Sequence, residues 1–286
     1  MTPIPVLWRC PIACVVSKPA GLATQAAADI PSLERRLIDE AVTTDGTDAN
    51  RFETPYLALP HRLDRCVGGV ILVARSKRAA RLLGQQFETR KVSKSYVAWV
   101  EGEPISADEL ASSQGGWVTW RDRLRKLSGK PKAELLAVDA PDEADAKEAI
   151  TLVRIARRRG GFTLLEMRPQ TGRMHQLRVQ TARRGAPIVG DRLYEARENA
   201  AWQAEAERIV AGGDAIALHA VRIGFHDPST SRWVEVDDLP SWGRTQNGSS
   251  PETPMEAAGA AANDMADWRV GAEDLTSDLT TAAPVV

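Results

Sequence analysis

The chain has 286 residues, of which 43% are apolar, and a formal net charge of −1 at pH 7. This length allows one large domain or two small ones, and the apolar content is ample for a buried core. No apolar run approaches the roughly 18 residues of a membrane span, and we expect no secretion signal at residues 1–9. The three cysteines, Cys10, Cys14 and Cys66, show no framework spacing. We therefore expect free thiols in a cytoplasmic protein.

In the first third of the chain, the spacing of apolar residues predicts a helix at residues 32–42, followed by two buried strands at 56–59 and 70–74. Ser76 is a suitable N-cap for a second helix that continues through Arg90.

Residues 94–100 alternate as a strand, which places Lys94 and Tyr96 on one face and Trp99 on the other. Residues 103–131 are polar and give no clear assignment.

The rest of the chain predicts mainly hairpins. Alternating segments at 150–156 and 162–168 flank Gly160-Gly161 and indicate one hairpin, and residues 216–225 and 232–236 indicate another. A further alternating segment covers 134–138. We expect Thr171 to cap a helix that ends at Gly185, and a further helix at 198–211.

Hairpins with separate helices predict an α+β fold: a mixed, largely antiparallel central sheet with flanking helices and a catalytic cleft. We expect one folded domain over residues 1–242. From residue 243 the composition changes, and seven acidic residues outnumber two arginines. Residues 243–286 are therefore predicted to be an acidic, disordered tail.

Basic residues are concentrated in two regions. Residues 61–100 hold nine basic and two acidic residues, and residues 154–192 hold ten and two, giving net charges of +7 and +8. Such regions are typical of a surface that binds a polyanion, although solvated helix faces also carry runs of charge.

The short loop around Asp64 has the most informative sequence. His61-Arg62-Leu63-Asp64 is followed by Arg65 and, three residues later, by a glycine pair that opens a strand. A carboxylate between two arginines in a loop held by strands is a candidate reacting group, but aspartate is also common in ordinary turns.

Five blocks of sequence together resemble the RluA-type pseudouridine synthases. Each block matches a motif of that family, and the blocks occur in the family's order over about residues 13–242. The blocks are VVSKPAGL at 15–22, HRLD at 61–64, KSYVAWVEG at 94–102, TGRMHQLR at 171–178 with GAPIVGD at 185–191, and LHA at 218–220.

The resemblance implies an enzyme that isomerises uridine in RNA, with Asp64 as the catalytic carboxylate and Tyr96 as the active-site tyrosine. Arg173 and Arg178 can both reach the site from one helix, and the family pattern favours Arg173 as the partner of Asp64. A cation at the start of a helix is disfavoured unless a carboxylate offsets it. A role in contacting phosphate alone stays open for both arginines.

Further residues in the same blocks are candidates for substrate contact. Arg62 is a candidate for the space left by a uridine flipped out of the RNA. We expect His61 and His175 to hold loops by hydrogen bonds, and Leu218 to pack against the ion pair. The complete candidate set for substrate binding is Arg62, His61, Arg65, Lys94, His175, Arg178 and Leu218. The histidines have no metal-ligand spacing, so we expect no metal.

We expect no organic cofactor, a monomeric protein, and a structured RNA, ribosomal or transfer, as its partner. The chain departs from the family where Val67-Gly68 replaces the usual Thr-Ser, which removes two hydroxyl groups beside Asp64. A synthase-like RNA-binding or assembly protein with weak or no turnover is therefore the alternative. A nucleoside hydrolase fits poorly, because no evident water-activating residue lies beside Asp64.

Overall fold

The computed structural model describes residues 2–27, 29–44, 56–136, 145–194 and 215–240. All of these lie in one unit, Met1–Pro240. The helix predicted at 198–211 and the tail predicted at 243–286 lie outside the described residues.

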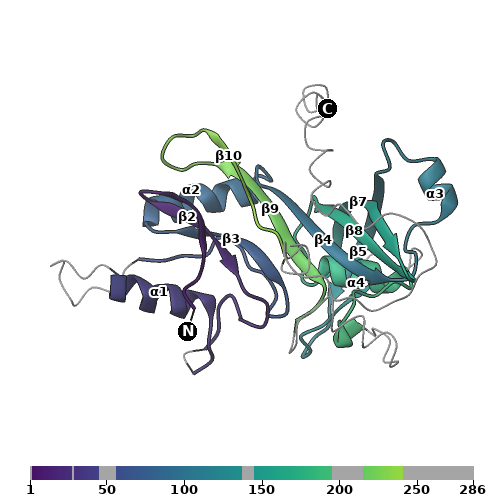
Figure 1. Ribbon diagram of the computed structural model, residues 1–286, viewed down its shortest axis with the longest axis horizontal. Coiled ribbons are helices and arrows are strands. Elements are labelled where there is room, and N and C mark those ends of the chain that lie inside the picture. The colour runs from purple at the N-terminus through teal and green to yellow at the C-terminus, as the bar shows by residue number, and fades with distance from the viewer. Residues whose placement is uncertain (1, 28, 45–55, 137–144, 195–214, 241–286) are drawn as a thin grey trace, which may run out of the picture. The chain divides into compact units, whose positions relative to one another are not determined.

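The described residues form ten strands, four α-helices and one 3-10 helix (Figure 1). The strands are β1 (Val6–Cys10), β2 (Ala13–Lys18), β3 (Gly68–Ala74), β4 (Ser93–Glu101), β5 (Val118–Lys126), β6 (Ala133–Leu135), β7 (Lys147–Arg159), β8 (Phe162–Pro169), β9 (Leu218–His226) and β10 (Trp233–Asp237). The helices are α1 (Leu33–Thr44), α2 (Lys77–Glu88), α3 (Ala107–Ala111), α4 (Gln176–Arg183) and η1 (Arg192–Tyr194).

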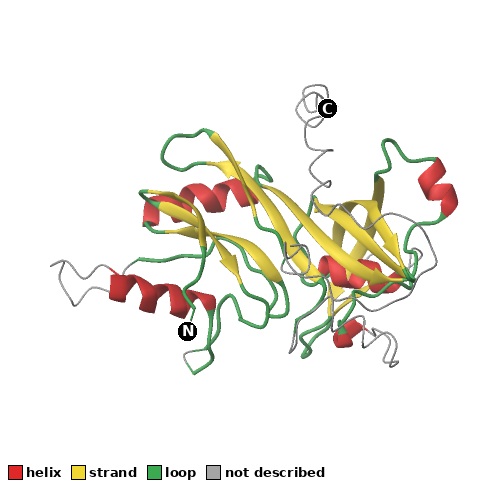
Figure 2. Cartoon of the chain, in the orientation of Figure 1, coloured by secondary structure: helices red, strands yellow, loops and turns green. Residues whose placement is uncertain are grey.

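The ten strands form one sheet in the order β1-β2-β3-β9-β4-β8-β7-β5-β6, with β10 paired to β9. The neighbouring strands pair antiparallel, except that β3 and β9 are parallel. Figure 2 shows the strands as the main element of this part of the chain, with helices beside them. The predicted α+β fold with a largely antiparallel sheet is confirmed.

Strand β9 joins the segments that carry the predicted motifs. Its first residues pair with β3 on one edge, where Gly69 lies opposite Ala220. On the other edge Ala220 lies opposite Tyr96 of β4. Gly69, Ala220 and Tyr96 therefore lie side by side on three adjacent strands, which brings the loop before β3 next to β4.

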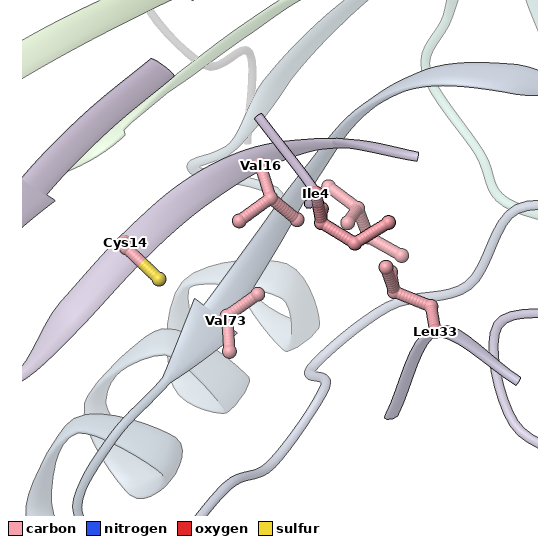
Figure 3. Close-up of a cluster of buried hydrophobic side chains, with 6 residues drawn as sticks. Ile4, Cys14, Val16, Leu33 and Val73 are labelled. Carbon is pink, nitrogen blue, oxygen red and sulfur yellow. The ribbon is translucent and has the colours of Figure 1, made fainter. Parts of the chain in front are cut away.

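A hydrophobic cluster packs α1 against strands β2 and β3 (Figure 3). Leu33 of α1 packs against Val16 of β2 and Ile71 of β3, and all three side chains are fully buried. Burial of one such aliphatic side chain contributes about 1.5–3 kcal/mol to folding. The same contacts hold β3, the strand that directly follows the loop of Asp64.

Several predicted elements are confirmed. Helix α2 begins after Ser76, whose hydroxyl accepts a hydrogen bond from the Ala79 amide at 3.1 Å. The hairpins β7–β8 and β9–β10 are also present.

Two expectations were wrong. Residues 56–59 form no strand but a single bridge from Ala58 to Ala74. The helix expected to begin after Thr171 begins instead at Gln176. Thr171 does not cap it, because the Thr171 hydroxyl accepts from the Ile150 amide at 2.9 Å and bonds the Gln176 side chain at 2.8 Å.

Among the helices in the described ranges, none combines the length and the apolar composition needed to cross a bilayer.

The β3–β9 junction gives a test of the fold. A Cβ atom at Gly69 would lie 2.2 Å from the carbonyl oxygen of Ala220, and Gly69 has a φ of +120°. Gly69→Ala should therefore lower the free energy of unfolding by about 2 kcal/mol or more, measured by urea titration with circular dichroism.

Gly84→Ala is the matched control. Gly84 lies inside α2, and a Cβ there would meet nothing within 4 Å. This variant should be more stable by about 0.5–1 kcal/mol, because alanine favours the helix. Equal effects of the two substitutions would contradict the proposed junction.

Candidate active site

The loop that carries Asp64 is fixed by hydrogen bonds to a second loop, residues 19–24. The hydroxyl of Thr24 donates to the Leu63 carbonyl at 2.7 Å and accepts from the Leu63 amide at 3.1 Å. The Gly21 amide donates to the Arg65 carbonyl at 2.8 Å. The residues on both sides of Asp64 are therefore held in place.

Backbone hydrogen bonds also hold the part of the loop where Val67-Gly68 stands in place of the expected Thr-Ser. Val67 is buried, and its amide donates to the Asp64 carbonyl at 3.0 Å, which closes a turn. The Cys66 carbonyl accepts from the Ile216 amide at 3.1 Å. Backbone groups thus fix the loop without the two missing hydroxyls.

Lys18 lies beneath the loop and is 1% exposed. Its ammonium donates to the carbonyls of Pro19 at 3.0 Å and Leu22 at 2.7 Å, and lies 3.4 Å from that of Arg65. Burial lowers the pKa of Lys18 to about 8, and the charge of nearby Asp64 opposes this shift. Lys18 therefore joins the two loops by its donor hydrogens.

The carboxylate of Asp64 is paired with Arg178 of α4. Nη1 of Arg178 donates to Oδ2 of Asp64 at 3.0 Å, and the other side of the guanidinium binds Asp191 by two bonds of 2.7 and 2.8 Å. The exposed fractions are 6% for Arg178, 1% for Asp191 and 32% for Asp64. Arg178 is thus anchored on a buried acid and holds an acid that ligands can reach.

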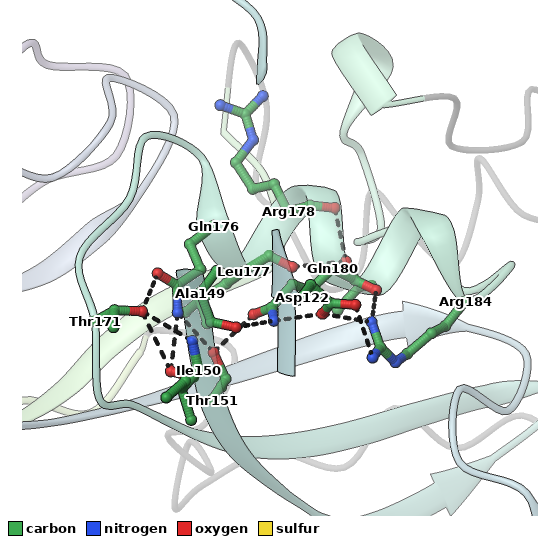
Figure 4. A network of polar contacts seen from close by, with 11 residues as sticks. Asp122, Ala149, Ile150, Thr151, Thr171, Gln176, Leu177, Arg178, Gln180 and Arg184 are labelled. Atoms are coloured by element: carbon green, nitrogen blue, oxygen red, sulfur yellow. Dashed lines mark hydrogen bonds and ion pairs between the residues drawn. The ribbon is translucent and has the colours of Figure 1, made fainter. Parts of the chain in front are cut away.

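A buried polar network fixes α4 so that Arg178 has this direction. Gln180 of α4 accepts a hydrogen bond from the Thr151 hydroxyl of β7 at 2.7 Å and donates to Asp122 of β5 at 2.7 Å. Figure 4 shows the Arg178 side chain extending away from this network. One side of the helix therefore binds the sheet, and the other presents the guanidinium to Asp64.

The expectation that Arg173 pairs with Asp64 was wrong. Nε of Arg173 donates to the backbone carbonyl of Glu148 at 2.9 Å. Arg173 lies before α4, since the helix begins at Gln176. Arg173 is therefore outside the first helical turn, where the helix dipole would act on it, and Arg178 takes the position at Asp64.

His175 also faces Asp64. Its Nε2 lies 3.7 Å from Oδ2 of Asp64, and its Nδ1 lies 2.9 Å from the hydroxyl of Tyr194. Burial lowers the pKa of His175, so the ring favours its neutral form. The contacts of Arg178 and His175 with Asp64 both fall on Oδ2.

Tyr96 lies within the electrostatic range of Asp64. Burial raises the pKa of the Tyr96 hydroxyl, and the negative charge of Asp64 raises it further. The strand register puts Tyr96, Ala98 and the buried Leu218 on the same face of the sheet. Lys94 of the same strand is partly buried, which lowers its pKa.

His61 holds the loop to β3, as expected. Its Nε2 accepts a hydrogen bond from the Leu72 amide at 2.8 Å, and its ring stacks on Phe87 of α2 at 4.8 Å. Burial lowers the pKa of His61 to about 3, and nearby Lys94 contributes to this. A neutral ring whose Nε2 is used in this way gives a structural role rather than substrate contact.

Arg62 and Arg65 are exposed on either side of Asp64. Nε of Arg65 donates to the Gly21 carbonyl at 3.1 Å. These two side chains supply positive charge at the surface next to the carboxylate.

Three residues of the site had no role in the sequence-based expectation: Lys18, Asp191 and Tyr194. Lys18 and Asp191 lie in the matched blocks, but nothing in their spacing shows that they turn inward. Tyr194 follows Asp191 by three residues, and only the tertiary contact with His175 reveals it. Within the described ranges, no group of three or more His, Cys, Asp or Glu side chains is placed to hold a metal ion.

Comparison with solved structures defines the fold class. Human RNA Pseudouridylate Synthase Domain Containing 4 superimposes with a TM-score of 0.64 at 22% identity, covering 83% of this chain and 89% of that one. Human RNA Pseudouridylate Synthase Domain Containing 1 gives 0.59 at 22% identity, covering 84% and 86%. The fold is that of a pseudouridylate synthase domain.

Sequence comparison gives the family. The family model described as RNA pseudouridylate synthase matches residues 13–183, which is more than half of the chain. This protein therefore belongs to the RNA pseudouridylate synthase family.

The names of related proteins agree with this family assignment. Ribosomal large subunit pseudouridine synthase D of Xylella fastidiosa is 33% identical over 192 residues, covering 67% of this chain and 52% of the relative. Ribosomal large subunit pseudouridine synthase C of Vibrio parahaemolyticus is 27% identical over 223 residues, covering 78% and 61%. The chain thus spans between half and two thirds of the length of these relatives.

The anchoring of Arg178 predicts a difference between two arginines. Arg178→Met leaves the buried Asp191 unpaired and should lower the free energy of unfolding by about 3–5 kcal/mol. Arg173→Met loses one hydrogen bond to a carbonyl and should cost about 1 kcal/mol. Urea titration measures both. Equal losses would contradict the assignment, and Arg178→Lys, which keeps the charge, should lie between them.

The lowered pKa of His61 predicts a dependence of stability on pH. The pKa of His61 is about 3 in the folded protein and near its usual 6.5 in the unfolded chain. Between these values the unfolded chain binds a proton that the folded protein does not, so the free energy of unfolding falls as the pH falls from 6.5 to 3.

His61→Gln keeps an acceptor for the Leu72 amide but does not titrate. Its free energy of unfolding should vary less over this pH range than that of the wild type, by up to about 1.4 kcal/mol per pH unit. Chemical denaturation at several pH values gives the two slopes. Identical slopes would show that His61 is already exposed to protons in the folded state.

Proposed function

We propose that this protein is an RNA pseudouridine synthase that isomerises specific uridines in ribosomal or transfer RNA. The observation that carries the proposal is the partly exposed Asp64 carboxylate, held on Oδ2 by Arg178 at 3.0 Å. Membership of the family and the names of the relatives support the same activity.

The reaction needs a carboxylate beside the anomeric carbon. The bond from ribose C1′ to uracil N1 breaks, the uracil rotates, and a new bond forms from C1′ to C5, after which C5 loses its proton and N1 takes one up. Uracil leaves as a delocalised anion, so one carboxylate suffices as the nucleophile at C1′ or as the base at C2′. Asp64 is the candidate for either role, with Oδ1 as the reacting atom.

Neighbouring side chains are proposed to hold the RNA. The exposed Arg62 and Arg65 flank Asp64, where they can neutralise phosphates, and Arg62 is proposed to fill the space of the flipped uridine. Tyr96 is the candidate to stack on the uracil and to move the C5 proton. Lys94, His175 and Leu218 complete the proposed surroundings of the nucleotide. The protein is proposed to act in the cytoplasm, as a monomer and without an organic cofactor or metal.

Asp64→Asn tests the proposal. The amide neither attacks C1′ nor takes a proton, so pseudouridine formation should fall at least 1,000-fold, on the scale of losing a catalytic group. Binding of the same RNA should change less than about threefold. Pseudouridine is mapped in RNA from cells that lack the gene, after incubation with each variant.

Asp39→Asn is the control, because Asp39 is an exposed aspartate of α1 that pairs with Arg35. It should retain full activity. If the wild type binds RNA but forms pseudouridine in no RNA of those cells, the synthase proposal is rejected and an RNA-binding role without turnover replaces it.

A further inference from the structure

We infer that Tyr194 is a positioning residue that fixes His175 as the neutral tautomer with its hydrogen on Nε2, directed at Asp64. This inference rests on the proposed function, because it assigns a task at the same carboxylate. It concerns two side chains that contact each other, and the tautomer of His175 can be measured without any turnover.

The hydrogen bonds of the Tyr194 hydroxyl set the direction of its proton. The Ala133 amide donates to this oxygen at 2.9 Å, and an amide can only donate. The hydroxyl proton then has two acceptors within reach, Nδ1 of His175 at 2.9 Å and the Ala133 carbonyl at 3.3 Å. The contact with His175 is the shorter of the two, and the inference assigns the hydroxyl proton to it, so that Nδ1 accepts and carries no hydrogen.

The other side of the ring requires the same arrangement. Nε2 lies 3.7 Å from Oδ2 of Asp64, and a carboxylate oxygen can only accept. With the hydrogen on Nε2 the ring presents a positive dipole to the carboxylate. With the hydrogen on Nδ1 a nitrogen lone pair would face Asp64, and the Tyr194 oxygen would have to accept two hydrogen bonds.

The backbone indicates that the His175 side chain is placed for this contact. His175 precedes α4 with a φ of 53°, in the left-handed region, and its side chain makes no capping bond to the helix. Such a conformation costs about 1 kcal/mol or more outside glycine. The ring packs edge-on against Tyr194 at 5.7 Å.

A neutral donor suits the chemistry proposed for Asp64. Arg178 already supplies one positive charge to Oδ2, and its guanidinium also lies over the Tyr194 ring at 5.2 Å. A second full charge would make the carboxylate a weaker nucleophile and base. A neutral N–H orients the plane of the Asp64 carboxylate without weakening it as a nucleophile and base. The contact between His175 and Asp64 can shorten when RNA excludes water.

Nitrogen NMR of the ¹⁵N-histidine-labelled protein at neutral pH tests the inference directly. The chain has four histidines, and the His175 signals are those lost in His175→Gln. We expect a neutral ring with the hydrogen on Nε2 in the wild type. Tyr194→Phe, which keeps the ring but removes the hydroxyl, should shift the population towards the other tautomer.

Tyr56→Phe is the matched control, since Tyr56 is 41% exposed, and it should leave the His175 signals unchanged. A wild-type ring with the hydrogen on Nδ1, or a charged ring, overturns the inference. So does a Tyr194→Phe spectrum equal to that of the wild type.

Turnover adds a second readout. Tyr194→Phe should lower kcat about 2- to 10-fold, the effect of one neutral hydrogen bond, with KM unchanged. His175→Gln, whose amide reaches the place of Nε2, should retain more activity than His175→Asn, and the reverse order overturns the inference. If the wild type forms no pseudouridine at all, the proposed function fails, while the spectrum still decides the tautomer.

Discussion

The site depends on one guanidinium shared by two carboxylates. Arg178 is almost completely buried, and the buried Asp191 neutralises it by two hydrogen bonds. An ion pair removed from water is costly unless its geometry is good and its remaining donors are satisfied. A further donor of the same guanidinium, on Nη1, is the one that Asp64 accepts. The accessible carboxylate is thus oriented by a pair that the folded protein must form in any case.

The supports of this pair come from different parts of the sheet. Gln180 fixes α4 on β7 and β5, and Thr24 and Lys18 fix the loop of Asp64 from below. These bonds use backbone carbonyls and amides or buried side chains, which are rigid partners. Groups that react must be held in a definite geometry, and here the rigidity comes from hydrogen bonds of residues other than Asp64.

Local sequence patterns predicted the elements whose signals are local. Ser76 capped a helix as expected, and Gly160-Gly161 closed the β7–β8 hairpin. The prediction failed at Thr171, because its hydroxyl bonds the Ile150 amide of another strand instead of capping a helix. That error displaced the helix start by several residues and assigned the ion pair to Arg173. The sequence thus identified the block that holds the arginine, but only tertiary contacts distinguish Arg178 from Arg173.

The bond between Asp64 and Arg178 joins residues 114 positions apart in the chain. Strand β9 joins the two parts of the sheet that carry them, because it pairs with β3 on one edge and with β4 on the other. Contacts between such distant segments form slowly and require the surrounding structure to be complete. The orientation of Asp64 is therefore a property of the assembled sheet, and the loop of Asp64 without α4 contains the carboxylate but not the guanidinium that orients it.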